Sequence, residues 1–331
     1  MQTKEDIKNK IKNFPELPGI YRMLDANGSI IYIGKSKCLK KRVQTYFVNS
    51  PKWEKVIRMV SLIKDVEYTV TDTHLEARLL ECKLIKFHQP IFNAQLKNDQ
   101  RYFYLKIDTY NPHHSMSVVS HRSEDCFGPF RGQYSMRDFL DKLKSIYPIT
   151  KLNDGYDINY HLFPIKMDRP NFENNRAILF ELFRDYNNIA SLIDALQEKL
   201  LEAASQYRYE HASLYRDLIH GFTVIQNGLN GYHTLSSRNI VLKLPILEGY
   251  KLFFISQSQI IHSVHMSKPT SEQIELFKSE AMQRLAAPNA SPLSDLTEAR
   301  SNKLSEKSSI DFRDILYSEI MSLPEDMIEI I

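Results

Sequence analysis

The residues whose types and spacing could do chemistry are concentrated in one stretch, Pro18–Phe47. Two tyrosines, Tyr21 and Tyr32, lie in two β-prone runs, and Tyr46 follows them at the end of a basic segment. The five basic residues of that segment fall within eight positions and are Lys35, Lys37, Lys40, Lys41 and Arg42. Positive side chains beside aromatic residues suit a nucleic-acid phosphate better than an apolar ligand. The alternative is that the tyrosines are ordinary strand aromatics and the lysines form a solvated face.

One carboxylate joins this set of reactive groups. A helix is expected over residues 73–88, and it carries two glutamates. Thr73 and Glu76 indicate a capping box, in which each side chain satisfies a backbone N–H at the start of the helix. Glu81 has no such local task, because it lies in mid-helix beside the apolar face. A mid-helix carboxylate is more often merely exposed than functional.

The spacing of the tyrosines resembles the signature of a nuclease family. Gly19-Ile20-Tyr21 is followed after ten residues by Tyr32-Ile33-Gly34, and the basic segment leads to Tyr46-Phe47. This pattern is similar to that of the GIY-YIG nucleases, and its continuation resembles their UvrC branch. In UvrC-type nucleases the metal-binding glutamate lies twelve residues before the asparagine of a Pro-x-x-Asn turn. The matching residues here are Glu81 and Asn93.

The resemblance implies a bound metal ion, a general base and a side chain that binds the scissile phosphate. Glu81 would hold one Mg²⁺, for which Mn²⁺ should substitute. Tyr32 would be the general base, with its pKa lowered by Lys35 and the metal. Arg42 would hold the scissile phosphate in a bidentate grip.

The other motif residues would position the reactants. Tyr21 and Tyr46 would orient the water and the phosphate, and Asn93 would fix either the local turn or the phosphate. The basic residues implied to bind DNA are Lys35, Lys37, Lys40, Lys41 and Arg42.

An α+β fold is expected to bring the residues of the motif together. A GIY-YIG catalytic domain is expected over residues 15–100, with a three-stranded antiparallel sheet flanked by helices. Its strands should lie near residues 19–24, 29–34 and 66–71, with an Asn27-Gly28 hairpin turn after the first and Gly34 ending the second. A helix after residue 51 should bury an apolar stripe formed by Trp53, Val56, Ile57, Val60 and Ile63.

A connecting α/β region is expected over residues 101–190. It should hold strands at 102–108 and 116–121 and helices at 136–147 and 172–186. Residues 191–222 are expected to form an antiparallel helical hairpin, and one interpretation is an ordinary structural element of the domain. The hairpin also resembles the UVR motif, by which UvrC proteins dock the damage-loading subunit UvrB. The residues implied to make that contact are Tyr209, Glu210, Arg216 and Asp217.

The last third of the chain is expected to hold a small β-rich unit at residues 223–286 and a flexible acidic tail at 287–331. Strands are expected at 239–244, 250–256 and 259–266, followed by a helix at 270–286. The tail contains Asp295, Asp311 and Asp314 in or beside a Ser-rich stretch. Two-metal chemistry needs rigidly held carboxylates. We therefore expect no second nuclease site there.

Charge and cysteine content narrow the possible partners and cofactors. Residues 1–100 hold 18 Lys and Arg against 11 Asp and Glu, whereas residues 287–331 hold 4 against 9. The N-terminal part is therefore the expected partner of a polyanion. The three cysteines, Cys38, Cys82 and Cys126, are scattered, so no iron–sulfur cluster is expected, although full-length UvrC proteins carry a cysteine cluster.

The sequence shows neither the apolar core of a signal peptide nor a run of ~20 apolar residues that could span a membrane. A cytoplasmic protein without a membrane partner is expected.

The expected function is a metal-dependent DNA endonuclease of nucleotide excision repair. It would make one cut, on the 3′ side of a lesion, in damaged double-stranded DNA presented by UvrB. In length and content the chain looks most like the shorter, Cho-type UvrC homologues. Two alternatives stay open: a stand-alone GIY-YIG endonuclease of the homing or restriction kind, and a non-catalytic adaptor of a repair complex.

Overall fold

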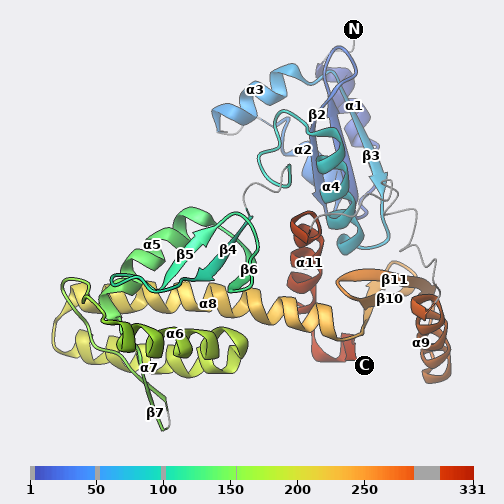
Figure 1. Cartoon of the computed structure of the whole chain (residues 1–331). Coiled ribbons are helices and arrows are strands. Elements are labelled where there is room, and N and C mark those ends of the chain that lie inside the picture. The colour runs from blue at the N-terminus through green and yellow to red at the C-terminus, as the bar shows by residue number, and fades with distance from the viewer. Residues whose placement is uncertain (1–3, 49–52, 98–101, 154, 287–305) are drawn as a thin grey trace. The chain divides into compact units, whose positions relative to one another are not determined.

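The computed structural model describes residues 4–48, 53–97, 102–153, 155–286 and 306–331. The chain divides into two compact units (Figure 1). One unit combines residues 1–99 with residues 234–331, and the other comprises residues 100–233. The two ends of the chain therefore fold together. None of the described helices is long and apolar enough to cross a membrane.

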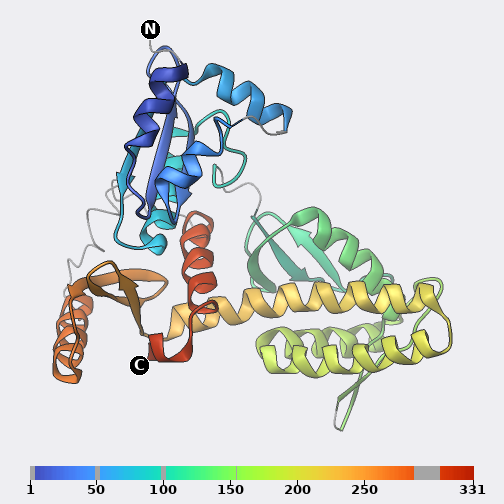
Figure 2. The same ribbon diagram turned by 180° about the vertical axis from the view of Figure 1, so that it is seen from behind.

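The N-terminal part of the first unit is built on a three-stranded antiparallel sheet. Its strands are β1 (Gly19–Leu24), β2 (Ile30–Ser36) and β3 (Asp65–Val70), in the order β2-β1-β3. Its helices are α1 (Lys4–Lys12), α2 (Leu39–Gln44), α3 (Glu54–Leu62) and α4 (His74–His88). Views from opposite sides show α4 on one face of the sheet and α1 and α2 on the other (Figures 1 and 2). The expected α+β fold with this sheet is confirmed.

The turn between β1 and β2 differs from the expected Asn-Gly hairpin. Only Gly28 takes a positive φ, of 75°, while Asn27 does not. The carboxylate of Asp25 accepts the backbone N–H groups of Asn27 and Ser29, and the carbonyl of Asp25 accepts the N–H of Gly28. The Asp25 side chain therefore organises the turn, and one left-handed residue is enough.

One further expectation about this part was wrong and another was right only in part. Gly34 does not end the second strand, because β2 continues to Ser36. Of the apolar stripe expected around α3, Ile63 is buried and Val56 and Val60 pack against the core, but Trp53 is 86% exposed and Ile57 is also exposed. Trp53 precedes the first helical residue and has an extended backbone, so its side chain does not join the helical stripe.

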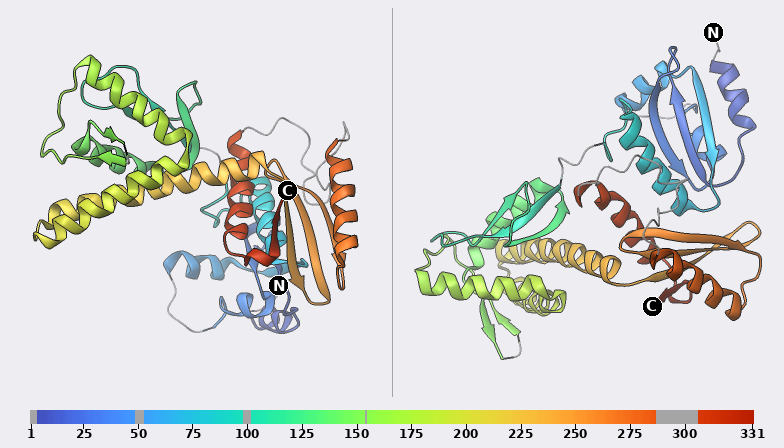
Figure 3. Two further views of the ribbon diagram at one scale, coloured as in Figure 1. Left: turned by 90° about the horizontal axis from the view of Figure 1, so that it is seen from below. Right: turned by 45° about the vertical axis from the view of Figure 1, so that its right-hand side comes forward.

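The C-terminal part of the first unit holds a second antiparallel sheet. Its strands are β9 (Ile240–Ile246), β10 (Gly249–Ser256), β11 (Gln259–Met266) and β12 (Ile328–Ile330), in the order β11-β10-β9-β12. The accompanying helices are α9 (Ser271–Ala286), α11 (Glu306–Ile320) and the short η3 (Glu325–Met327). Alternate strand residues face opposite sides: Leu252 and Phe254 share a cluster with Phe277 of α9, whereas Phe253 shares one with residues of α11. The two helices lie on opposite sides of this sheet (Figure 3).

The expectation of a flexible tail is wrong for its second half. Residues 306–320 form α11, and β12 pairs with β9. Ile315 and Leu316 of α11 are buried in the same apolar cluster as Leu79 of α4. Burial of this apolar face stabilises a segment whose acidic and serine-rich composition alone indicated disorder. The first part of the expected tail, residues 287–305, lies outside the described residues.

The second unit contains the strands β4 (Tyr102–Ile107), β5 (Met116–Val119) and β6 (Cys126–Arg131) in the order β5-β4-β6, with a small hairpin of β7 (Thr150–Leu152) and β8 (Gly155–Asp157). Its helices are α5 (Gln133–Leu143), η2 (Lys144–Ile146), α6 (Arg169–Arg184), α7 (Tyr186–Ser205) and α8 (Tyr209–Ser237). The helical hairpin is therefore present, but α8 runs well past residue 222. Gly221 and Gly228 lie inside α8 and do not end it. A Cβ on Gly221 would lie 2.0 Å from the ring of Phe139, and one on Gly228 would lie 2.8 Å from the ring of Phe130, so both glycines leave room for a neighbouring ring.

Candidate active site on the N-terminal sheet

Three tyrosines come together on the N-terminal sheet. Tyr21 lies on β1, Tyr32 on β2, and Tyr46 follows α2. The ring centroids are 6.0 to 6.2 Å apart, and the hydroxyls of Tyr21 and Tyr46 are hydrogen-bonded at 2.9 Å. Arg42 lies over the ring of Tyr46 and donates to its hydroxyl at 3.3 Å. The structure thus gathers four of the expected site residues.

Two glycines make this arrangement possible. A Cβ on Gly34 would lie 2.4 Å from the phenol carbon and the hydroxyl of Tyr21. A Cβ on Gly19 would lie 2.3 Å from the carbonyl oxygen of Thr69 on β3. Real Cβ atoms do not approach other atoms this closely. Gly34 therefore leaves room for the Tyr21 ring across the strand, and Gly19 lets β1 and β3 approach.

Glu81 reaches β2 from α4. Its Oε1 accepts the backbone N–H of Lys35 at 3.0 Å, and the side chain is largely removed from solvent. Burial raises the pKa of Glu81 to about 7, although the Lys35 N–H and the charges of Lys35, Arg78 and Arg42 act in the opposite direction. Glu76, by contrast, forms the expected capping box with Thr73 and an ion pair with Lys251 at 2.5 Å. The two glutamates of α4 thus have different partners.

The donor set around Glu81 fits a hard divalent cation. No cluster of three or more His, Cys, Asp or Glu side chains occurs among the described residues, so a soft or fully protein-caged ion is not indicated there. Glu81 offers its second oxygen, Oε2, which has no hydrogen-bond partner in the described part of the chain. One carboxylate plus water is a donor set that Mg²⁺ accepts.

Asn93 is tied to the strand that carries Tyr32. Its amide oxygen accepts the N–H of Ile33 at 3.0 Å, and its amide nitrogen donates to the carbonyl of Ile33 at 2.8 Å. The neighbouring N–H of Phe92 donates to the carbonyl of Ile31. Of the two expected tasks of Asn93, fixing the local backbone is the one that these hydrogen bonds fit.

Comparison with known proteins gives a family match for this part of the chain. Residues 17–94 match the family model described as a UvrC-like GIY-YIG domain. The matched range contains the three tyrosines, Arg42, Glu81 and Asn93. Residues 17–94 form a GIY-YIG domain.

Similarity to curated proteins extends beyond this domain. UvrABC system protein C of Acetivibrio thermocellus is 35% identical over 282 residues, which are 78% of this chain and 45% of that protein. The corresponding protein of Methanococcoides burtonii is 35% identical over 226 residues, covering 63% of this chain and 37% of that one. The chain therefore spans less than half the length of these relatives.

One solved structure is similar to part of this chain. The GIY-YIG N-terminal endonuclease domain of UvrC from Thermotoga maritima, bound to its catalytic divalent cation magnesium, is 39% identical. The match covers 28% of this chain and 100% of that one, with a TM-score of 0.26.

The protein groups around Tyr32 of the GIY-YIG domain do not favour ionisation of its hydroxyl. Burial, followed by Tyr46 and Glu81, raises the pKa of Tyr32 above its ordinary value, against a smaller effect of Tyr21. Lys35 was expected to lower that pKa, but its ammonium group lies 3.1 Å from Nε2 of His74. Burial and nearby positive charges lower the pKa of His74 to about 4, so its ring is neutral at pH 7 and accepts this hydrogen bond.

The basic residues of the GIY-YIG domain surround α2. Lys37, Lys41 and Arg42 are exposed, whereas Lys35 and Lys40 are partly buried. Lys41 makes a 3.6 Å ion pair with Glu16, in which both side chains are exposed and which is therefore weak. Exposed cations of this kind are available to a polyanion.

Sequence reasoning missed two residues beside Glu81. His74 holds the Lys35 ammonium group, and Arg78 lies one turn before Glu81 on α4 and acts on its charge. The signal for Arg78 was its spacing, because side chains three positions apart on a helix are neighbours.

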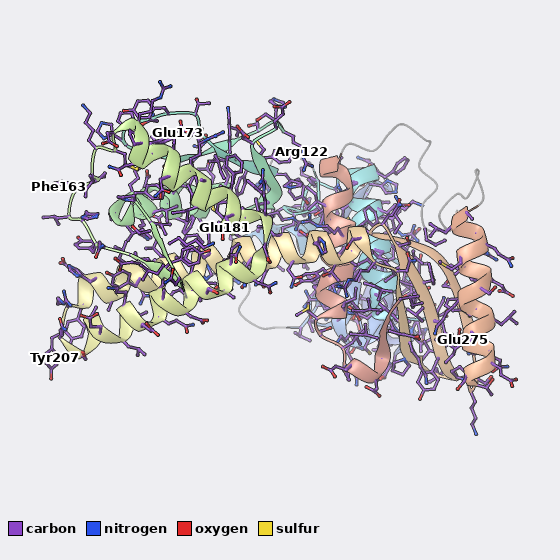
Figure 4. All side chains as sticks on the ribbon, turned by 60° about the horizontal axis from the view of Figure 1, so that its bottom comes forward. Arg122, Phe163, Glu173, Glu181, Tyr207 and Glu275 are labelled. Atoms are coloured by element: carbon purple, nitrogen blue, oxygen red, sulfur yellow. The ribbon has the colours of Figure 1, made fainter. Side chains whose placement is uncertain are left out.

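The hairpin residues expected to bind a partner lie in the second unit. Tyr209, Glu210 and Arg216 are exposed, and the ring centroid of Tyr209 lies 6.3 Å from that of the exposed Tyr207. Figure 4 shows Tyr207 at the turn of the hairpin. Asp217 is half-buried and accepts from Lys142 of α5 at 2.9 Å. Asp217 thus has a contact within its own unit.

The C-terminal carboxylates do not form a second site in the described residues. Asp295 lies outside those residues. Asp311 is buried and pairs with Lys86 at 2.9 Å, and Asp314 accepts from Arg313. Asp311 and Asp314 are therefore held on an ordered helix and not in a mobile stretch, contrary to expectation, but each faces a cation.

Proposed function

We propose that the protein is a metal-dependent DNA endonuclease of nucleotide excision repair. The observation that carries this proposal is the convergence of Tyr21, Tyr32, Tyr46 and Arg42 beside one partly buried glutamate, Glu81. The site combines phosphate-binding cations, hydroxyl groups and a carboxylate, which phosphodiester hydrolysis needs. The similarity to UvrC proteins supports the DNA substrate.

Glu81 is the proposed ligand of one Mg²⁺, for which Mn²⁺ would substitute. When bound, such an ion supplies positive charge that stabilises the phosphoryl and leaving oxygens. Burial of Glu81 disfavours its carboxylate in the metal-free protein, and a cation compensates for that cost. The hydrogen bond from Lys35 holds Oε1 in place and leaves Oε2 for the ion.

The remaining residues act on the phosphate and the water. Arg42 is proposed to hold the scissile phosphate, for which its guanidinium is exposed at the edge of the tyrosine cluster. Tyr32 is proposed to accept the proton of the attacking water. Tyr21 and Tyr46 fix one another through their hydroxyls and would orient these reactants.

DNA is proposed to reach this site through a UvrB-like loading subunit. A basic helix supplies affinity for phosphates but cannot read bases. The exposed residues Tyr209, Glu210 and Arg216 are the proposed contact with that subunit. Asp217, which bonds Lys142, is assigned to holding the hairpin on α5.

One incision, on the 3′ side of the lesion, is proposed for this chain. Damaged duplex with both strands end-labelled and preloaded with UvrB tests the proposal. We expect a single Mg²⁺-dependent cut 3′ to the lesion, and none with Glu81→Ala. Two cuts flanking the lesion would exclude the single-incision claim and assignment to the Cho type.

The same assay separates the alternatives. Equal cutting of undamaged DNA without a partner would favour a stand-alone GIY-YIG endonuclease. Binding to the UvrB-loaded duplex without any cut would favour a non-catalytic adaptor. The paired variants Tyr209→Ala and Asp217→Ala test the docking surface, since only the first should weaken UvrB binding without destabilising the hairpin.

A further inference from the structure

The helix that carries Glu81 has a second contact surface. On the face next to the one that bears Glu81, α4 contributes Leu75, Leu79 and Cys82 to an apolar cluster with Ile315 and Leu316 of α11. The helix is therefore held on one side by the sheet of the GIY-YIG domain and on the other by the C-terminal helix. The family match ends at residue 94, so α11 lies far outside it in the sequence.

Two ion pairs bracket this apolar contact. Arg78 donates to Glu319 at 2.9 Å and also to the hydroxyl of Ser318, and Lys86 lies 2.9 Å from Asp311. The partners are eight residues apart on each helix and run in opposite directions, as in an antiparallel helix pair. All four charged side chains are largely buried. Removing one partner of such a pair leaves an uncompensated buried charge.

The two ion pairs and the apolar contact between α4 and α11 are called the clamp below. Arg78 connects this clamp to the candidate active site. It lies one turn before Glu81, and its charge is among those that lower the pKa of Glu81 against the larger effect of burial. Glu319 of α11 in turn acts electrostatically on Lys35, whose N–H holds Glu81. Both terminal nitrogens of Arg78 are engaged by α11, so this guanidinium is not available to a phosphate.

We propose that α11 positions the glutamate of the nuclease site. Glu319 and Ser318 hold Arg78, Asp311 holds Lys86, and together they fix α4 so that Glu81 stays on the backbone N–H of Lys35. Arg78 and Glu319 are thus positioning residues and not catalytic ones. The inference rests on the proposed nuclease function, and it makes the C-terminal helix part of the reactive site.

The kinetic test compares Glu319→Gln and Glu319→Arg with a matched control, Glu275→Gln. Glu275 belongs to an ion pair of α9 in the same unit and points to solvent (Figure 4). A displacement of about 1 Å at a reacting group can cost about a hundredfold in rate. We expect kcat on the UvrB-loaded damaged duplex to fall about tenfold with Glu319→Gln and about a hundredfold with Glu319→Arg, with KM for DNA little changed. The control should match the wild type, and wild-type kcat in Glu319→Arg would overturn the proposal.

A second measurement does not depend on activity. The amide of Lys35 donates to Glu81, so its hydrogen exchange in the metal-free protein reports the position of that carboxylate. We expect Glu319→Gln to speed exchange at Lys35, as Glu81→Ala should, while Glu275→Gln leaves it unchanged. Unchanged exchange at Lys35, or an equal rise throughout β1–β3, would overturn positioning by α11. Faster exchange at Lys35 in a protein that cuts no DNA would keep the positioning role and reject the nuclease.

Exchanging the charges of Arg78 and Glu319 provides a rescue experiment for the position of Glu81. Arg78→Glu combined with Glu319→Arg restores opposite charges across the two helices. We expect the double variant to regain most of the protection of the Lys35 amide that either single variant loses. A double variant no better protected than the worse single variant would overturn the clamp.

Discussion

At the residue scale, the two glutamates of α4 have separable tasks. Glu76 caps the helix and pairs with Lys251, while Glu81 accepts a strand N–H and is the proposed ligand of a cation. We expect Glu81→Ala to abolish cleavage while folding and DNA binding are retained. Glu76→Ala should instead lower the free energy of unfolding by ~1–2 kcal/mol, because the cap is lost, with little change in activity. Urea unfolding and cleavage assays of both variants decide this, and an inactive Glu76→Ala would reverse the assignment.

The buried carboxyl of Glu81 should also make stability depend on pH. Burial raises its pKa from 4.5 to about 7. Between these values the folded protein binds more protons than the unfolded chain, so Glu81 stabilises the fold below pH 4.5 and this contribution is lost as pH rises to 7. Unfolding experiments in EDTA at several pH values measure how the free energy of unfolding changes with pH. In Glu81→Gln this part of the pH dependence of stability should be absent. Identical pH profiles of stability for the wild type and Glu81→Gln would contradict the raised pKa of Glu81.

The glycines of the motif allow a matched steric test. Gly34→Ala places a Cβ against the phenol of Tyr21, whereas Gly28 has open space but a left-handed backbone. We expect Gly34→Ala to displace Tyr21 and abolish cleavage. Gly28→Ala should cost about 1 kcal/mol of stability with activity retained. Activity at the wild-type level in Gly34→Ala would show that the Tyr21 position is not needed.

At the scale of elements, α3 shows how far an apolar pattern can mislead. Met59 is buried, whereas the larger Trp53 is exposed. Met59→Ala should therefore cost about 2–5 kcal/mol by leaving a cavity. Trp53→Ala should change stability by no more than about 0.5 kcal/mol. Thermal unfolding of the two variants tests this, and the reverse ranking would place Trp53 in the core.

Local signals predicted the elements that local chemistry determines. The capping box at Thr73 and the strands around Tyr21 and Tyr32 follow from short-range patterns, and the structure has them. The length of α8 did not follow, because its glycines are explained only by rings from another element, such as Phe139. The contact of α11 with α4 was equally invisible, because the paired charges are more than 200 residues apart.

At the scale of the whole molecule, the cysteines predict a protein without iron. Cys38, Cys82 and Cys126 form no disulfide with one another in the described part of the chain, and Cys82 and Cys126 belong to different compact units. Purified protein should be colourless, and cleavage should survive an iron chelator when Mg²⁺ is supplied. Absorbance and metal analysis are the measurements, and a brown protein with stoichiometric iron would refute the expectation.

The site itself was predictable to the extent that it lies in one motif. The positions of Tyr21, Tyr32, Arg42 and Glu81 followed from spacing and resemblance. The contacts between the site residues and their neighbours did not follow, because the ammonium group of Lys35 contacts His74 and not Tyr32. Which neighbour a flexible ammonium group contacts depends on the packing of α4, and a single sequence does not carry that information.

The hydrogen bonds of β2 have a consequence for association between copies of the protein. The sheet order makes β2 an outer strand, and such strands can recruit strands from other molecules. Four of its outward backbone groups are occupied: Phe92 donates to the carbonyl of Ile31, Asn93 bonds both groups of Ile33, and Glu81 accepts the N–H of Lys35. The residues proposed for catalysis therefore also shield an edge that could otherwise seed aggregation. A substitution at Asn93 would expose both backbone groups of Ile33, so the chain would lose solubility along with activity.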